Sequence, residues 1–296
     1  MDLHDALSGI ACPTITPFDD GEVDEAALVD LLAHLREGGV DSVFACGTSG
    51  EFPSLGPEER RRVIELTVDH ADGPVIACSG ATSVGEAVDH VDNAADAGAD
   101  AAALVPPYFT PANAPQGNER FFERVAEETT LPIVLYNIPQ YTGQRIEPET
   151  VSALAERDEF VGIKDSSGDL TYFQSLVRET PEAFRCLMGY DSLLVPSIRL
   201  GGDGGINALS NVVPRTFREA VDAAETERGQ ELQSEAIAPL FETCASHGFA
   251  QATKTGLVHR DVIPSDEVRP PLVSTDDAAA DEIRTVLEES LAVAER

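Results

Sequence analysis

Short apolar segments of strand length alternate along the chain with longer segments in which apolar residues recur every three or four positions. Several of the short segments lack the polar alternation of a half-exposed strand, which is typical of parallel strands buried on both faces. Eight stretches of this kind are candidate strands: residues 9–18, 41–47, 74–80, 101–107, 132–137, 160–165, 184–189 and 204–209.

The segments between the candidate strands carry the start and stop signals of helices. Residues 25–38 place four leucines on one face, acidic residues lead the first turn, and Gly38-Gly39 ends the pattern. The strand-helix unit repeats about every 25 to 30 residues, and eight such units predict an α/β fold of the (β/α)8 TIM-barrel type. A doubly wound sheet is the main alternative, but the turn after the first strand, TPFDDGEVDE, is not a GxGxxG motif.

The strand pattern stops at about residue 225, whereas helical patterns continue to the end of the chain. We therefore predict a barrel over residues 1–225 and a C-terminal helical extension over residues 226–296 that packs on it. Residues 262–277 are expected to form a loop between helices of the extension.

The charge of the chain excludes some classes of partner. The 53 acidic and 20 basic residues give a formal net charge of −33, which repels nucleic acids and anionic membranes. Because molar salt shortens the Debye length to about 3 Å and screens self-repulsion, we predict a halophilic protein. No apolar run approaches the roughly 18 residues of a membrane span, and the N-terminus lacks a signal-peptide pattern, so we expect a cytoplasmic location.

Cysteine and histidine show no metal-binding pattern. The five cysteines are widely spaced and form no CxxC pair, which indicates reduced, buried residues. The six histidines fall mainly in helical patterns and not at strand ends. We therefore expect no metal site.

Lysine is nearly absent from the chain, which makes each lysine notable. Only Lys164 and Lys254 occur, and the other 18 basic residues are arginine. Lys164 closes the apolar stretch FVGIK, where desolvation favours the neutral amine that forms a Schiff base with a carbonyl. The alternative is a lysine that reaches solvent or pairs with Asp165. Since arginine supplies charge elsewhere in this chain and cannot act as a nucleophilic amine, the catalytic interpretation is favoured.

Active sites of (β/α)8 barrels lie at the carboxyl ends of the strands, so the residues that close the other apolar stretches are candidates too. The motif GTSGE places Thr48, Ser49 and Gly50 in a tight turn suited to a carboxylate, although an ordinary helix-capping turn fits the motif equally well. Tyr136 closes the strand before that of Lys164 and is placed to relay protons. Tyr108 closes the strand before that of Tyr136 and is a candidate for substrate binding.

The motifs GTSGE, YNIP and GIKDSSGD, in this order and at these strand ends, resemble the dihydrodipicolinate synthase and N-acetylneuraminate lyase superfamily. The resemblance covers nearly the whole chain. It implies a pyruvate imine on Lys164, a 2-oxo acid carboxylate held by Thr48 and Ser49, and a proton relay at Tyr136. It also implies that Ile206 lines the site, that no cofactor is needed and that the protein forms a homotetramer.

Two positions depart from the synthases of this superfamily. The synthases commonly carry YNVPxRTG, whose arginine grips the carboxylate of aspartate semialdehyde, whereas this chain has Tyr141 there. They also carry a second tyrosine after the fourth strand, where this chain has Phe109. The pattern is closer to archaeal 2-keto-3-deoxygluconate aldolases. Arg145 is a further candidate for binding a phosphate or carboxylate.

The expected function is that of a Schiff-base aldolase in carbohydrate metabolism of the Entner-Doudoroff type. It would cleave 2-keto-3-deoxygluconate or its 6-phosphate to pyruvate and glyceraldehyde or its 3-phosphate. The first alternative is a 4-hydroxy-tetrahydrodipicolinate synthase, which condenses pyruvate with aspartate semialdehyde. An alternative of another class is a non-catalytic sensor of 2-oxo acids, which would not need an imine-forming lysine.

Overall fold

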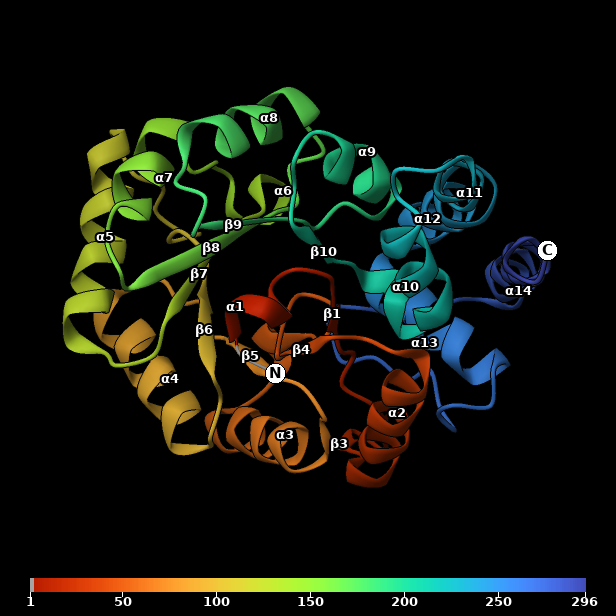
Figure 1. The fold of residues 1–296 in the computed structure, drawn as a ribbon. Coiled ribbons are helices and arrows are strands. Elements are labelled where there is room, and N and C mark those ends of the chain that lie inside the picture. Colours follow the sequence, from red (N-terminus) through yellow and green to blue (C-terminus); the bar gives the residue numbers. More distant parts are fainter. Residues whose placement is uncertain (1–2) are drawn as a thin grey trace.

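The computed structural model describes residues 3–296. Eight parallel strands close into a barrel in the order β1-β10-β9-β8-β7-β6-β5-β4 (Figure 1). The predicted (β/α)8 fold is confirmed, and each of the eight candidate stretches contains one strand. The strands are β1 (Ile10–Pro13), β4 (Ser42–Ala45), β5 (Val75–Cys78), β6 (Ala101–Leu104), β7 (Ile133–Asn137), β8 (Phe160–Asp165), β9 (Arg185–Met188) and β10 (Gly204–Ile206).

Helices form an outer ring around the strands (Figure 1). Their ends follow the sequence signals: the side chain of Asp24 accepts a hydrogen bond from Ala27 N at the start of α2, and Gly39 in the left-handed conformation ends this helix. The ring consists of α2 (Glu25–Gly38), α3 (Pro57–His70), α4 (Val84–Asp96), α5 (Pro115–Glu128), α7 (Pro148–Ala155), α8 (Leu170–Glu179), α9 (Leu194–Arg199) and α10 (Pro214–Asp222).

Short helical turns lie in the loops that follow the strands, at the end of the barrel where a site is expected. They are η1 (Phe52–Ser54) after β4, α6 (Pro139–Thr142) after β7, η2 (Asp191–Leu193) after β9 and η3 (Ala208–Asn211) after β10.

The first strand is shorter than the stretch 9–18 predicts. Barrel pairing ends at Pro13, and the chain continues to a small hairpin of β2 (Phe18–Asp19) and β3 (Glu22–Val23). Pro13 and Pro17 lack the N–H group that a continued ladder needs, so the apolar stretch leaves the sheet there.

The interior of the barrel is packed with side chains of its own strands, among them Phe44, Ile76, Val134 and Leu187. Leu7, just after the short helix α1 (Leu3–Ala6), belongs to the same cluster. Figure 1 shows α1 lying over the middle of the ring of strands. The chain enters β1 directly from this segment, so the amino end of the barrel is covered and the carboxyl end remains for a site.

Beyond residue 225 the regular elements of the described chain are all helical, as the sequence predicts. They are α11 (Glu227–Glu231), the π-helical turn η4 (Leu232–Ile237), α12 (Ala238–His247), α13 (Phe249–His259) and α14 (Asp277–Ala294). In Figure 1 these helices gather on one side of the barrel, near α10. The domain boundary at residue 225 stays a prediction. None of the helices in residues 3–296 is long and apolar enough to cross a membrane.

Candidate active site

Lys164 lies at the carboxyl end of β8, level with Tyr136 of β7 and Leu187 of β9 in the parallel ladder. Its residue is only 4% exposed. The Nζ atom lies 4.3 Å from the centre of the Tyr136 ring and 4.7 Å from that of the Phe44 ring. The amine therefore sits in a nearly dry, aromatic corner of the barrel, an environment that suits a Schiff-base nucleophile.

The phenol of Tyr136 connects this corner to the turn after β4. Its Oη lies 3.2 Å from Oγ1 of Thr48, and either hydroxyl can donate. The buried Tyr136 ring also packs edge-on against Phe44, with ring centres 5.9 Å apart. Two hydroxyls in hydrogen-bond contact beside an amine can carry a proton to and from a reacting oxygen.

Asp165, the neighbour of Lys164 in sequence, has partners of its own. Its carboxylate accepts hydrogen bonds from Asn137 Nδ2 at 2.8 Å and from the N–H and hydroxyl of Ser167, each at 3.0 Å. Consecutive strand residues point to opposite faces, which separates this carboxylate from the Lys164 amine. Burial raises the pKa of Asp165 to about 6.

A cavity of about 460 Å³ adjoins Lys164 and includes several of the predicted residues in its wall, namely Thr48, Ser49, Tyr136, Tyr141 and Ile206. Phe241, Gly248 and Phe249 of the helical extension complete the wall, which the sequence did not predict. Among the described residues that line this cavity, Lys164 is the only one with a cationic side chain. Its size suits a small-molecule ligand.

The motif GTSGE forms a closed turn. Glu51 N donates to the carbonyl of Thr48 at 3.1 Å, and the hydroxyl of Thr16 donates to the carbonyl of Gly50 at 2.8 Å. A Cβ atom on Gly50 would lie 2.8 Å from the carbonyl oxygen of Thr14, so glycine is needed for this close approach. Thr48 and Ser49 line the cavity, whereas Gly50 does not line it and instead allows the turn to pack closely against Thr14.

Two predicted tyrosines line a cavity next to the site, and only Tyr141 also lines the Lys164 cavity. Tyr141 is 67% exposed and lines both the Lys164 cavity and a neighbouring cavity of about 350 Å³. Tyr108 lines only the neighbouring cavity, where its ring packs edge-on against Phe52 at 6.5 Å. Desolvation raises the pKa of both Tyr108 and Tyr141, so both are neutral phenols at physiological pH.

Arg145 and Phe109 lie outside the wall of the Lys164 cavity. The Nε atom of Arg145 pairs with the carboxylate of Glu147 at 3.2 Å, and its guanidinium lies 5.7 Å from the centre of the Tyr172 ring. Phe109 is 88% exposed, more than any other large apolar side chain of the described residues. The structure thus does not bring Arg145 to the place that Tyr141 occupies.

Asp191 is a wall residue that the sequence reading missed. It follows β9 and accepts hydrogen bonds from Leu209 N at 2.8 Å, Ala208 N at 3.2 Å and Asn207 Nδ2 at 3.3 Å. Burial raises the pKa of Asp191 to about 6, even though these hydrogen bonds and the charge of Lys164 act in the opposite direction. Its only sequence signal was a position just beyond the end of a strand, which many structural aspartates share.

Residues 6–290 match the Dihydrodipicolinate synthetase family. The chain belongs to this family. A relative from Syntrophus aciditrophicus, named 4-hydroxy-tetrahydrodipicolinate synthase, is 36% identical over 95% of this chain and 98% of its own.

Solved structures agree with the assignment to the dihydrodipicolinate synthetase family. The 4-hydroxy-tetrahydrodipicolinate synthase of Methylacidiphilum fumariolicum SolV is similar with a TM-score of 0.92 and 30% identity, over 97% of both chains. YagE, a protein of this family from E. coli K12 solved in complex with pyruvate, has a TM-score of 0.89 and 30% identity over 96% of this chain and 98% of its own.

Membership of the dihydrodipicolinate synthetase family fixes the class of chemistry. Its members are pyruvate-dependent Schiff-base lyases that act on small molecules and typically form oligomers. The protein is therefore a carbon–carbon lyase of this family. The name of these relatives, 4-hydroxy-tetrahydrodipicolinate synthase, favours the synthase over the sugar-acid aldolase that the sequence predicts.

Proposed function

We propose that this lyase is a Schiff-base aldolase that cleaves 2-keto-3-deoxygluconate or its 6-phosphate into pyruvate and glyceraldehyde or its 3-phosphate. The observation that carries the proposal is the chemistry of the cavity wall. Lys164 is its only cation among the described residues, and hydroxyls such as those of Ser49 and Tyr141 supply polar contacts. This wall suits a hydroxylated, uncharged fragment better than a second anion, which also favours the free sugar acid over its phosphate.

In the proposed reaction, the neutral amine of Lys164 adds to the carbonyl carbon C2, and loss of water gives an iminium that draws electrons from C3. The C3–C4 bond then breaks, and its electron pair forms an enamine conjugated to the lysine nitrogen. The C4 hydroxyl transfers its proton to the Tyr136 oxygen as the Tyr136 hydroxyl gives its own proton to Thr48 and the Thr48 hydroxyl gives its own to solvent, and C4 leaves as the aldehyde. Protonation of C3 and addition of water release pyruvate and the free lysine.

The same proposal gives the turn after β4 a binding role. Thr48 and Ser49 line the same cavity as Lys164, and Thr48 contacts the Tyr136 hydroxyl. A 2-oxo acid joined to Lys164 through C2 would direct its C1 carboxylate towards these hydroxyls and the backbone of the turn. Backbone N–H groups in tight turns are well suited to carboxylates.

The second candidate is 4-hydroxy-tetrahydrodipicolinate synthase, which the names of the relatives favour. In that reaction the pyruvate enamine attacks aspartate semialdehyde, whose own carboxylate needs a cationic partner. Arg145 is the nearest candidate in sequence, but it pairs with Glu147 outside the cavity wall. The arginine would have to leave this pair before it could serve the substrate, so the wall favours the aldolase.

A paired assay in molar salt distinguishes the two candidates. One arm follows pyruvate release from 2-keto-3-deoxygluconate and from its 6-phosphate, and the other follows pyruvate consumption with aspartate semialdehyde. We expect release from the sugar acid, with the free acid preferred. Turnover of aspartate semialdehyde alone would overturn the aldolase proposal and establish the synthase.

The imine itself is tested by reduction. Borohydride added together with pyruvate should inactivate the enzyme and add a reduced pyruvate to the Lys164 peptide, as measured by mass spectrometry. Lys164→Arg keeps the charge but lacks a nucleophilic amine, so it should lose at least about 10³-fold in kcat and form no adduct. Appreciable turnover by Lys164→Arg, with its fold intact by circular dichroism, would refute the mechanism.

We also propose a homotetrameric assembly and a cytoplasmic location. A homotetramer is supported by the oligomeric habit of the family. The five cysteines are buried and unpaired, which accords with the reducing cytoplasm that we propose.

A further inference from the structure

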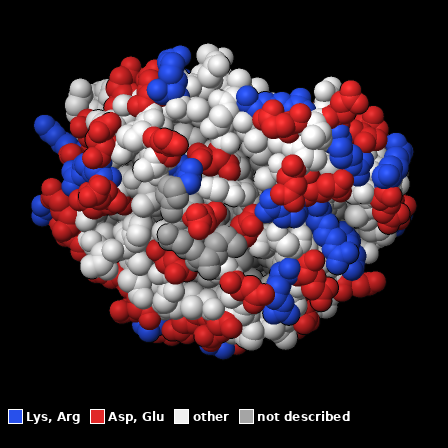
Figure 2. Space-filling model, in the orientation of Figure 1, with Lys and Arg blue, Asp and Glu red and all other residues white. Residues whose placement is uncertain are grey.

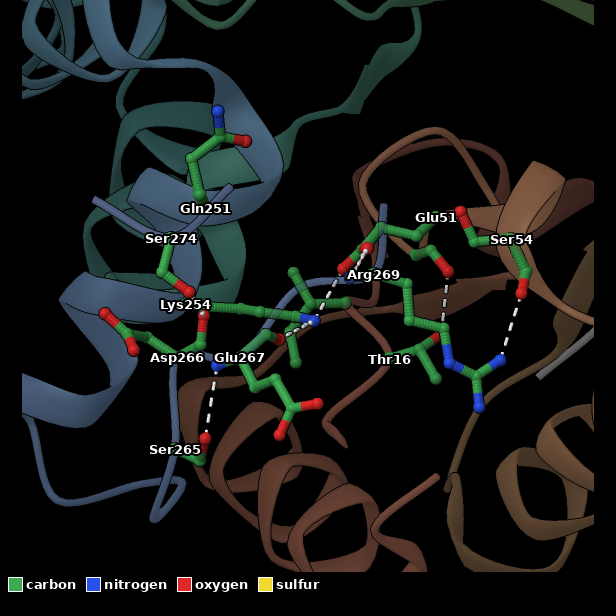
Figure 3. Close-up of polar contacts among 12 residues, drawn as sticks. Thr16, Glu51, Ser54, Gln251, Lys254, Ser265, Asp266, Glu267, Arg269 and Ser274 are labelled. Atoms are coloured by element: carbon green, nitrogen blue, oxygen red, sulfur yellow. Dashed lines mark hydrogen bonds and ion pairs between the residues drawn. The ribbon is translucent and has the colours of Figure 1, made fainter. Parts of the chain in front are cut away.

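The second lysine of the chain, Lys254, lies outside the Lys164 cavity and is fully buried in α13. Its Nζ donates to Oε1 of Glu51 at 2.5 Å and to the carbonyl of Glu267 at 2.6 Å (Figure 3). The ammonium also lies 4.2 Å from the centre of the Phe18 ring. Glu51 belongs to the turn after β4, 203 residues away in sequence, so the pair ties this turn to the helical extension.

Arg269 uses the other oxygen of the same carboxylate. Its backbone N–H donates to Oε2 of Glu51 at 3.0 Å (Figure 3). The Arg269 guanidinium donates hydrogen bonds to the carbonyl of Ser54 at 2.9 Å, to the carbonyl of Gly21 at 2.6 Å and to the carboxylate of Glu59. The turn, the hairpin between β2 and β3, and the start of α3 are thus held together by one segment of the extension.

A buried ion pair is a poor device for stability alone. Desolvation of the two charges offsets much of their attraction, and an apolar pair of similar volume often stabilises a fold equally well. A buried pair does fix geometry, since its donors and acceptors are satisfied in one arrangement only. The chain places one of its two lysines here, although it otherwise relies on arginine for positive charge.

The geometry that the pair fixes is that of the turn carrying Thr48 and Ser49. Glu51 has φ 54° and ψ 38°, a left-handed conformation that is unusual for a residue other than glycine and persists where contacts hold it. Its N–H closes the turn onto the carbonyl of Thr48. The side chain of Glu51 therefore anchors the residue whose backbone closes the turn.

We propose that Glu51 and Lys254 are positioning residues for the 2-oxo acid carboxylate: their buried pair holds the turn so that Thr48 and Ser49 face the cavity. The inference rests on the proposed function, in which these two residues bind that carboxylate. Glu51 and Lys254 are absent from the wall of the Lys164 cavity, so they act through the turn and not on the substrate. The helical extension thereby controls how well the site holds a 2-oxo acid.

The test compares a ketone that has the carboxylate with one that lacks it. Borohydride trapping is measured by intact mass over a range of pyruvate concentrations and, separately, of hydroxyacetone. In Lys254→Met the pyruvate concentration for half-maximal trapping should rise at least about tenfold, and that for hydroxyacetone should stay within about twofold. An equal rise for both ketones, or no rise for pyruvate, would overturn the positioning role.

A double-variant cycle tests whether the two residues act as one unit. Glu51→Gln should raise the half-maximal pyruvate concentration as Lys254→Met does, and the double variant should be no worse than the worse single variant. If the rise in the double variant equalled the product of the two single rises, the two residues would act independently, which would contradict the proposed pair. Arg228→Met is the matched control, because the Arg228 side chain bonds to Glu219 of α10 and to Glu231, Val293 and Ala294 of the extension, away from the turn. Its pyruvate trapping should match the wild type.

The design separates failure of the inference from failure of the function. If the wild-type protein forms no adduct with pyruvate, the proposed function and the inference both fall. If the wild-type protein does form the adduct, and Lys254→Met raises the half-maximal trapping concentrations of both ketones alike, only the inference falls. Where Lys254→Met does not fold, Glu51→Gln alone replaces it, since the amide keeps the size of the side chain and removes the charge that pairs with Lys254. A pyruvate-specific rise of at least about tenfold is expected there, and no change would overturn the inference.

Discussion

At the scale of single residues, Tyr136 makes the contact with the clearest chemical consequence, its 3.2 Å approach to the Thr48 hydroxyl. Tyr136→Phe keeps the ring that packs on Phe44 but removes the relay oxygen. We expect kcat to fall by about 10² to 10⁴, the usual contribution of general acid-base catalysis, while half-maximal trapping by pyruvate changes little. Steady-state kinetics beside borohydride trapping provide the measurement, and an unchanged kcat would contradict the relay.

Tyr141 stands where the synthases of the superfamily carry an arginine, and it lies at the mouth of the cavity. Tyr141→Arg should place a guanidinium near the second substrate and raise kcat/KM for aspartate semialdehyde by at least about tenfold, or ~1.4 kcal/mol. Tyr141→Phe is the control, because it changes the side chain without adding charge. If both variants respond alike to the semialdehyde, charge at this position does not decide substrate choice.

The place of Lys164 at the end of a barrel strand, in the wall of a cavity, could be predicted from sequence because the chain is so poor in lysine and because the residue closes an apolar strand. Asp191 and Glu51 could not. An acidic residue beyond a strand is usually a cap or a surface group, and its burial depends on loops that pack over it from distant parts of the chain. The partner of Glu51 lies 203 residues away, a separation that no local pattern encodes.

At the scale of elements, Asp191 joins the end of β9 to η3, and its titration should be visible in folding stability. Its folded-state pKa of about 6 lies above the ordinary value of 3.8, so between these values the folded protein keeps a proton that the unfolded chain has released. Stability contributed by this group is therefore lost as pH rises from about 4 to 6.

Asp191→Asn cannot ionise and should remove that contribution. In Asp191→Asn the free energy of unfolding, measured by urea titration in molar salt from about pH 4 to about pH 7, should fall with pH less steeply than in the wild type. The difference in slope should correspond to at most about one bound proton. Asp158→Asn, at an exposed position, should leave the slope unchanged. A wild-type slope in Asp191→Asn would show that Asp191 does not carry this proton.

The helices and strands were predictable where burial determines which positions must be apolar. All eight candidate strands contain a barrel strand, because a strand covered on both faces must be apolar throughout. The first one was predicted too long, since an apolar run alone does not reveal that Pro13 and Pro17 end the ladder. The use of α12 and α13 as cavity wall was also missed, because a helix signal contains no information on what its apolar face will cover.

At the scale of the whole molecule, the net charge of −33 dominates. Figure 2 shows acidic side chains spread over most of the visible face, with basic ones between them. We expect the melting temperature to rise steadily as KCl increases from about 0.1 M to about 2 M, because salt screens repulsion among these charges. Equal stability and activity across this range would refute the proposed halophilic character, and sucrose at matched osmolality is the control for effects unrelated to charge.

The scarcity of lysine has a practical consequence for labelling chemistry. Both lysine side chains are almost inaccessible, with Lys164 at 4% and Lys254 at 0% exposure. Bulky amine-directed dyes and cross-linkers should therefore leave the lysines of the folded protein unmodified. A small carbonyl reagent that fits the cavity meets Lys164 alone, so the amount of lysine adduct becomes a direct count of intact active sites in any preparation.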